Sequence, residues 1–224
     1  MKKVNLLAII AIILVVVVAV VLLFCFGNRS ESDNKGDLLK CSTVSDVEDY
    51  IRRNEIKRYE LNDDACAIDG ISVFGANSIV EISFQDKAVS RINVDYTLFQ
   101  DSFEGLSEEE RESFDITQYQ FSQENKERID KAFNEIKISF EQYVDGSVDH
   151  YDLIPTQEGV SIEENEDLFY QGLLIKEYSL RDRNHVLWLL RYQAAYGMAH
   201  ATLIKIVDET GYEGFVPIVD LTKA

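Results

Sequence analysis

An uninterrupted apolar run near the N-terminus constrains this chain more than any other feature of its sequence. Residues 6–26 read LLAIIAIILVVVVAVVLLFCF, which is 21 residues without a charged side chain. At about 1.5 Å of rise per residue, a helix of this length matches the roughly 30 Å thickness of a bilayer core. The run therefore predicts a transmembrane anchor at 6–26, preceded by a cytoplasmic leader at 1–5.

There are two alternatives to a retained anchor: a cleaved signal peptide and a lipoprotein signal. A cleaved signal peptide normally has an apolar region of about 7–15 residues that ends at a small-x-small cleavage site. The run here is longer, and no Ala-x-Ala follows it before Gly27. A lipoprotein would be acylated at Cys25, but that processing favours a small residue where this chain has Phe24. The pattern favours a retained signal-anchor, with the membrane as a partner through 6–26.

Basic residues lie on both sides of the run: Lys2 and Lys3 before it, and Arg29, Lys35 and Lys40 after it. The two leader lysines stand at the membrane edge, whereas a long downstream domain is translocated largely regardless of its own charge. We therefore expect a single-pass protein of the cell membrane with its N-terminus inside and its domain outside the cytoplasm. The reversed orientation is the alternative.

The rest of the chain is polar at first and then has the composition of a folded domain. Residues 27–37 read GNRSESDNKGD, with no apolar side chain, which is typical of a flexible tether. We assign the tether to 27–40 and one extracytoplasmic α+β domain to 41–224.

The charge balance excludes one class of partner. The chain has 40 Asp and Glu against 22 Lys and Arg, for a net charge of -18. Without Lys2 and Lys3 of the predicted leader, the remaining chain has a net charge of -20. Because a nucleic-acid surface needs clustered Lys and Arg, we expect no nucleic-acid partner.

Two cysteines, Cys41 and Cys66, belong to the predicted domain. A disulfide between them would close a loop of about 25 residues and contribute on the order of 3 kcal/mol by restricting the unfolded chain. Two buried thiols are the alternative, because unpaired cysteine is among the most buried residue types. The sequence leaves both open.

Local patterns predict the elements of the domain. Ser45 and Glu48 have the spacing of a capping box and predict a first helix that ends near Asn54. Apolar alternation and turn residues predict strands at 71–74, 79–84 and 92–98. An apolar stripe at 129, 133, 136, 140 and 143 predicts a long helix over 122–144.

Elsewhere in the domain the patterns are weaker. Ser107 and Glu110 predict a short helix within the acidic segment 101–115. We expect strands at 168–180 and 186–192, and for 194–210 we favour a helix that stops at Gly211 over a strand. The apolar tail at 214–219 is expected to be extended. Tight turns between the strands indicate an antiparallel sheet packed with two or three helices, hence the α+β class.

Motifs for chemistry are absent from the sequence. His150, His185 and His200 have none of the spacings that zinc ligands use, and the acidic clusters lack the order of an EF-hand loop. There is no nucleophile elbow and no Gly-rich phosphate loop. We therefore predict no catalytic residue, metal or cofactor.

One turn stands out from the acidic background. Arg181, Arg183 and His185 lie close to Trp188, and arginine and tryptophan are favoured at binding hot spots. We take these four residues as the candidate binding site for an acidic group; ordinary surface arginines beside a core tryptophan are the alternative.

These observations favour a non-catalytic binding or interaction module whose partner is an envelope protein or a small ligand. A surface-tethered hydrolase with carboxylates dispersed in the sequence is the alternative function. An anchor, a tether and a small α+β domain recur in many unrelated bacterial envelope proteins, which is an architectural analogy only.

Overall fold

The computed structural model describes residues 37–102, 107, 119–148, 151–160 and 166–209. Apart from Asp37, these residues belong to one compact unit, Leu38–Ala224. The leader and anchor, most of the predicted helix at 101–115 and the tail at 214–219 lie outside the described residues. Within the described part of the chain, no helix is long and apolar enough to cross a membrane.

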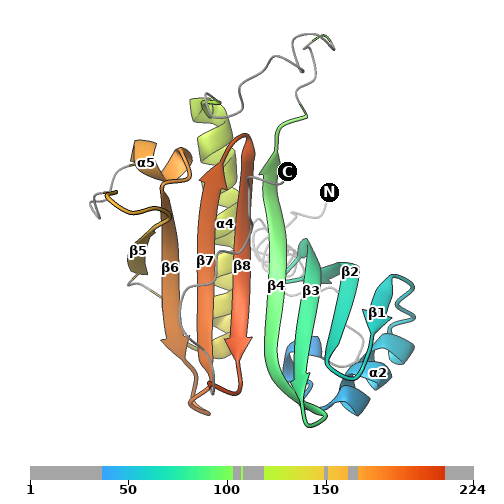
Figure 1. Ribbon diagram of the computed structural model, residues 1–224. Helices are drawn as coiled ribbons and strands as arrows, with labels where there is room; N and C mark the ends of the chain where they lie inside the picture. Colours follow the sequence, from blue (N-terminus) through green and yellow to red (C-terminus); the bar gives the residue numbers. More distant parts are fainter. Residues whose placement is uncertain (1–36, 103–106, 108–118, 149–150, 161–165, 210–224) are drawn as a thin grey trace, which may run out of the picture. The chain divides into compact units, whose positions relative to one another are not determined.

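The described strands form one antiparallel sheet (Figure 1). They are β1 (Tyr59–Leu61), β2 (Ala65–Val73), β3 (Ala76–Gln85), β4 (Ala88–Gln100), β5 (Tyr151–Pro155), β6 (Leu174–Arg181), β7 (Leu187–Ala195) and β8 (Met198–Ile206). Their order across the sheet is β1-β2-β3-β4-β8-β7-β6-β5. Two runs of hairpins therefore meet where β4 pairs with β8, and the predicted α+β class with an antiparallel sheet is confirmed.

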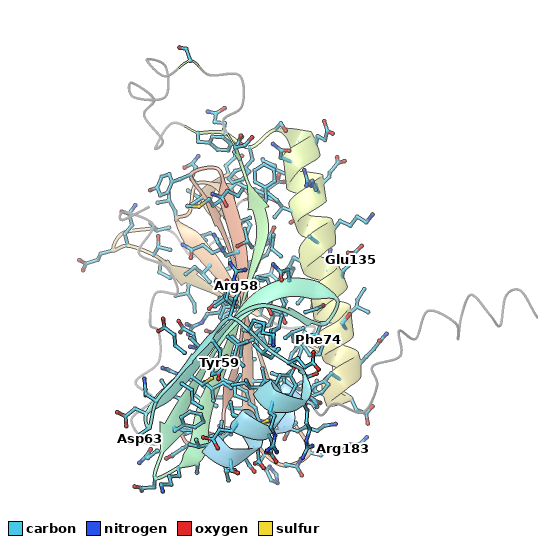
Figure 2. The ribbon with its side chains drawn as sticks, turned by 90° about the vertical axis from the view of Figure 1, so that its right-hand side faces the viewer. Arg58, Tyr59, Asp63, Phe74, Glu135 and Arg183 are labelled. Atoms are coloured by element: carbon cyan, nitrogen blue, oxygen red, sulfur yellow. The ribbon has the colours of Figure 1, made fainter. Side chains whose placement is uncertain are left out.

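The described helices cover one face of this sheet, which Figure 2 shows from the side. They are α2 (Val44–Arg53), α4 (Gln123–Val144) and α5 (Glu166–Tyr170), with a 3₁₀ turn η1 (Leu38–Lys40) before them. Their buried residues join those of the strands in one core. Aromatic rings fill its centre: Phe133 of α4 stacks on Tyr192 of β7 with ring centroids 4.3 Å apart.

Helix α4 confirms the long helix predicted over 122–144. Its buried residues are four of the five predicted stripe positions, Ile129, Phe133, Ile136 and Phe140. The Ser122 hydroxyl accepts the N–H of Asn125 at 3.2 Å and so caps the first turn. Asp145 ends the helix in the left-handed conformation at φ 52°.

The hairpin of β2 and β3 bends toward this helix. Its turn places Phe74 at φ 52° and Gly75 at φ 80°, and a phenylalanine is uncommon in the left-handed region. The Phe74 ring lies 5.4 Å from the Tyr143 ring and 6.3 Å from the Phe140 ring, centroid to centroid. This packing on α4 stabilises the conformation, and Figure 2 shows Phe74 beside the helix.

The helix favoured for 194–210 is wrong. Tyr196 and Gly197, at φ 51° and 77°, turn the chain from β7 into β8, which occupies most of that segment. The segment 203–207 does not alternate because β8 is buried on both faces: Leu203 packs toward α4 and Ile204 toward the opposite side. A strand that is buried on both faces has a continuous apolar run, which resembles a buried helix in sequence.

Several predicted boundaries also change, and the strand predicted at 71–74 is the end of β2, which begins at Ala65. Helix α2 is capped by Thr43 with Asp46, not by Ser45 with Glu48. The strand predicted at 168–180 begins only at Leu174, because 166–170 form α5 and Gly172 turns at φ 76°. The tether predicted to reach residue 40 stops earlier, since Leu38 and Leu39 of η1 are buried in the core.

Cys41 and Cys66 are both buried, and the structure joins them in no disulfide. Burial raises the pKa of the Cys66 thiol to about 11.

Candidate functional site

The turn between β6 and β7, which contains the residues singled out in the sequence, is organised by Asp182. One carboxylate oxygen accepts the backbone N–H of Asn184 at 2.8 Å and that of Val186 at 3.1 Å. The other accepts the indole N–H of Trp188 at 3.1 Å. Burial alone would raise the pKa of Asp182, but these hydrogen bonds outweigh it and the pKa is lowered. The carboxylate therefore stays ionised and holds the turn against the tryptophan.

The four predicted site residues do not act as one group. Arg183 and Trp188 line a common pocket. Arg181 instead binds the carboxylate of Glu209 through both terminal nitrogens, at 2.5 and 2.9 Å. His185 is an exposed turn residue at φ 65°, outside the pocket lining.

The pocket has a volume of about 260 Å³, and we call it the basic pocket. Its walls come from η1, the end of α4, the β6–β7 turn and two strands. It is lined by Leu39, Lys40, Tyr143, Val144, Asp182, Arg183, Asn184, Val186, Trp188 and Lys205. Three cationic side chains thus converge with one carboxylate, on a chain whose net charge is -18.

Each cation is held in place by a neighbouring group. Lys205 lies opposite Trp188 in the β7–β8 ladder, and its ammonium donates to the Leu39 carbonyl at 2.6 Å. The same nitrogen lies 5.7 Å from the centroid of the Trp188 ring. The Lys40 ammonium lies 5.7 Å from the centroid of the Tyr143 ring.

Arg183, the third cation, forms an ion pair with Asp145, the residue that ends α4. Both side chains are largely exposed, so solvent screens this pair. Figure 2 shows Arg183 near the end of α4 and the first helix. Arg183 therefore lies at the rim of the basic pocket, where a ligand can reach it.

Sequence reasoning missed two of the three cations. Lys40 was assigned to the tether, and Lys205 to the helix favoured for 194–210. One signal was present for Lys205: it is the lone charge in the apolar run 203–207, which marks it as a residue with a specific environment. No pattern in the sequence predicts that Lys40 lies near the β6–β7 turn, because only the tertiary structure places η1 beside that turn.

The chemistry of the lining suits binding. It offers cationic groups and an indole ring, and it contains no serine, cysteine or histidine. No group of three or more potential metal ligands occurs within the described residues.

A second hollow, of about 410 Å³, lies between α2 and the edge strand β1. Glu48 and Glu55 line it together with Arg52 and Lys57, so its charges balance. This hollow therefore favours neither an anionic nor a cationic ligand.

Comparisons of the chain with protein-family models, with curated proteins and with solved structures found no match.

Proposed function

We propose that this chain is a membrane-anchored, extracytoplasmic binding module that holds a small anionic ligand in the basic pocket. The observation that carries the proposal is the convergence of Lys40, Arg183 and Lys205 around Trp188. The anchor rests on the apolar run at 6–26, and the location rests on the orientation argument from the leader lysines.

The charge of the pocket supports an anion. Asp182, the one carboxylate of the lining, already accepts hydrogen bonds from Trp188 and two backbone amides. An anion at the rim would therefore face three cations, of which Arg183 is shared with the exposed Asp145, and one lining carboxylate whose oxygens already accept hydrogen bonds. Charge-assisted hydrogen bonds are each worth roughly 1.5–3 kcal/mol, so two of them support measurable affinity.

The size of the pocket limits the ligand. Sites for drug-sized molecules usually enclose about 300–1,000 Å³, and the basic pocket lies just below that range. The ligand class that fits is therefore a small molecule with a phosphate, sulfate or carboxylate group.

The test uses Trp188, which is the only tryptophan of the chain and lies in the pocket wall. Inorganic phosphate is titrated against the full chain in mild detergent at constant ionic strength, and tryptophan fluorescence is measured. We expect a saturable change, and we expect Arg183→Gln and Lys205→Met each to weaken it about tenfold, since each removes one charge-assisted hydrogen bond.

Arg58→Gln is the matched control, because Arg58 is an exposed arginine that pairs with Asp69, stands just before the edge strand β1 and does not line the basic pocket. It should leave the titration unchanged. A fluorescence change that does not saturate, or that is the same in the pocket variants and the parent, would contradict the proposal. Thermal unfolding of each variant separates lost binding from lost folding.

A further inference from the structure

The two edge strands of the sheet, β1 and β5, differ in what they offer to a further strand. At the end of β5 the amide of Thr156 donates to the Leu173 carbonyl of the neighbouring segment at 3.0 Å. Because successive residues of a strand point their N–H and C=O groups to opposite sides, the nitrogen of Pro155 points away from β6. Proline has no N–H, so an outward proline weakens the pairing of this edge with another strand.

The opposite edge, β1, carries neither proline nor lysine and ends the sheet next to β2 (Figure 1). Just before β1, the Arg58 carbonyl accepts the amide of Asp69 on β2 at 3.0 Å. By the same alternation, the N–H and C=O groups of Tyr59 and Leu61 point away from β2. Among the described residues, none forms a backbone hydrogen bond with these outward groups. The free edge of β1 can therefore pair with another strand.

The side chains at this edge are accessible and sorted by face. Tyr59 is 47% exposed, and it lines the hollow beside α2 together with Leu61. Side chains alternate along a strand, so Arg58 and Glu60 lie on the opposite face of the sheet. Glu60 is exposed, and Arg58 is largely exposed although it pairs with Asp69 at 3.2 Å. An incoming strand would thus meet an aromatic residue on one face and two opposite charges on the other.

The charges of this edge fit a second copy of the same edge. If two β1 strands pair antiparallel around a two-fold axis at Tyr59, each Arg58 lies directly opposite Glu60 of the second copy, and opposite charges in that position stabilise a strand pair. An axis at Glu60 would set two like charges opposite each other, which is destabilising. An axis at Leu61 would need Asp63, which lies beyond the end of β1. The charge pattern therefore selects the axis at Tyr59.

We infer that two copies of this chain associate through β1, in a two-fold pairing that continues the sheet from one copy into the other. The N–H and C=O of Tyr59 in each copy bond those of Tyr59 in the other. Each Arg58 lies between Asp69 of its own β2 and Glu60 of the second copy. Because β1 has only three residues, these side-chain pairs set the register of a short ladder. None of these residues lines the basic pocket, so the inference is independent of the proposed function.

Cysteine crosslinking of the full chain in mild detergent tests the pairing. A residue on the axis meets its own copy at a Cα separation of about 5.5 Å, which a disulfide can span. With copper phenanthroline as the oxidant, we expect Tyr59→Cys to form a covalent dimer about tenfold faster than Asp63→Cys, an exposed turn residue that meets its copy only by collision. The parent chain, with its own cysteines, gives the background. Equal rates for the two variants, or no dimer from Tyr59→Cys, would overturn the inference.

A mixture of two variants tests the register. Arg58→Cys and Glu60→Cys chains that carry tags of different size are combined and oxidised together. We expect the mixed dimer, because these two positions are directly opposed at a Cα separation of about 4.5 Å, whereas neither position is opposed to its own copy. A Glu60→Cys chain that crosslinks mainly to itself would place the axis at Glu60 and contradict the proposed register.

Charge reversal keeps the test independent of introduced cysteines. Analytical ultracentrifugation of the full chain in detergent measures the dimer dissociation constant. Arg58→Glu should raise it about tenfold or more, because like charges then oppose each other twice in the ladder. Adding Glu60→Arg to the same chain should restore the dimer, and thermal unfolding of each variant confirms that the domain is folded. A parent chain that is monomeric, a dimer that Arg58→Glu leaves unchanged, or a failure of the second substitution to restore it would each overturn the inference.

Discussion

At the residue scale, Asp95 shows how the sheet controls ionisation. It lies on the face of the sheet opposite α4, between Thr202 of β8 and Ile79 of β3. Burial raises its pKa, the hydrogen bond from Thr202 opposes that shift, and the nearby charge of Glu81 adds to it. The folded protein therefore holds a proton on Asp95 to higher pH than the unfolded chain does.

This raised pKa predicts the sign of a stability change with pH. Between about pH 4, the ordinary pKa of an aspartate, and the folded pKa of Asp95, the folded state binds more protons than the unfolded state. The contribution of Asp95 to stability therefore falls as pH rises through this window. Because Asp95→Asn removes the ionisation, the variant should gain stability relative to the parent from pH 4 to pH 7, measured by urea unfolding.

Asp69→Asn is the control for this experiment, because Asp69 is an exposed aspartate paired with Arg58. It should show no such gain. A constant difference between Asp95→Asn and the parent across the pH range would contradict the assignment.

At the element scale, the start of α2 shows how two similar signals compete. The Thr43 hydroxyl accepts the N–H of Asp46 at 3.2 Å, and the Asp46 carboxylate accepts the N–H of Thr43 at 3.0 Å. Ser42 adds two more donors to the same carboxylate. Together these hydrogen bonds, that of the Ser42 backbone first, lower the pKa of Asp46. Ser45 lies inside the first turn instead, although its spacing to Glu48 also fits a capping box.

A pair of substitutions separates the two capping positions. Thr43→Ala should destabilise the protein by about 1 kcal/mol, because it removes the side chain that caps α2. Ser45→Ala should change stability by no more than about 0.5 kcal/mol, because Ser45 is an exposed residue of the helix. Denaturant unfolding of both variants measures this, and equal effects would be inconsistent with Thr43 as the cap.

At the scale of the whole molecule, the sheet depends on one long-range pairing. β4 and β8 join the two hairpin runs, and the hydrogen bond from Thr202 to Asp95 connects positions 107 apart in the sequence. The basic pocket depends on the same arrangement, because β8 brings Lys205 beside η1. The basic pocket and the strand order of the sheet therefore both depend on the pairing of β4 with β8.

The proposed location of the domain outside the cytoplasm depends on the whole chain, including its N-terminal segment. It is therefore tested in intact cells. A membrane-impermeant amine reagent should modify Lys57 and Lys87, which are exposed, before the cells are lysed. Mass spectrometry of the purified chain reads the modified sites. Modification of these lysines only after lysis would favour the reversed orientation. A cytoplasmic protein from the same cells serves as the control for membrane integrity.

The sequence by itself determined the elements whose signals are local. The apolar stripe at 129, 133, 136, 140 and 143 predicted α4, because a helix repeats its apolar face over a few residues. Turn residues at 85–87 and the alternation from Ile92 onward predicted the β3–β4 hairpin for the same reason. The class of the fold followed from these pieces.

Only the tertiary structure decided what depends on distant contacts. Burial on both faces made 198–206 a strand, since strands in the middle of a covered sheet lose the alternation that identifies them in sequence. Arg183 and Trp188 were visible as candidates, but Lys40 and Lys205 joined them through η1 and β8. Sheet order and the basic pocket arise from pairings between distant segments, and a local pattern carries no information about which distant segment will be its neighbour.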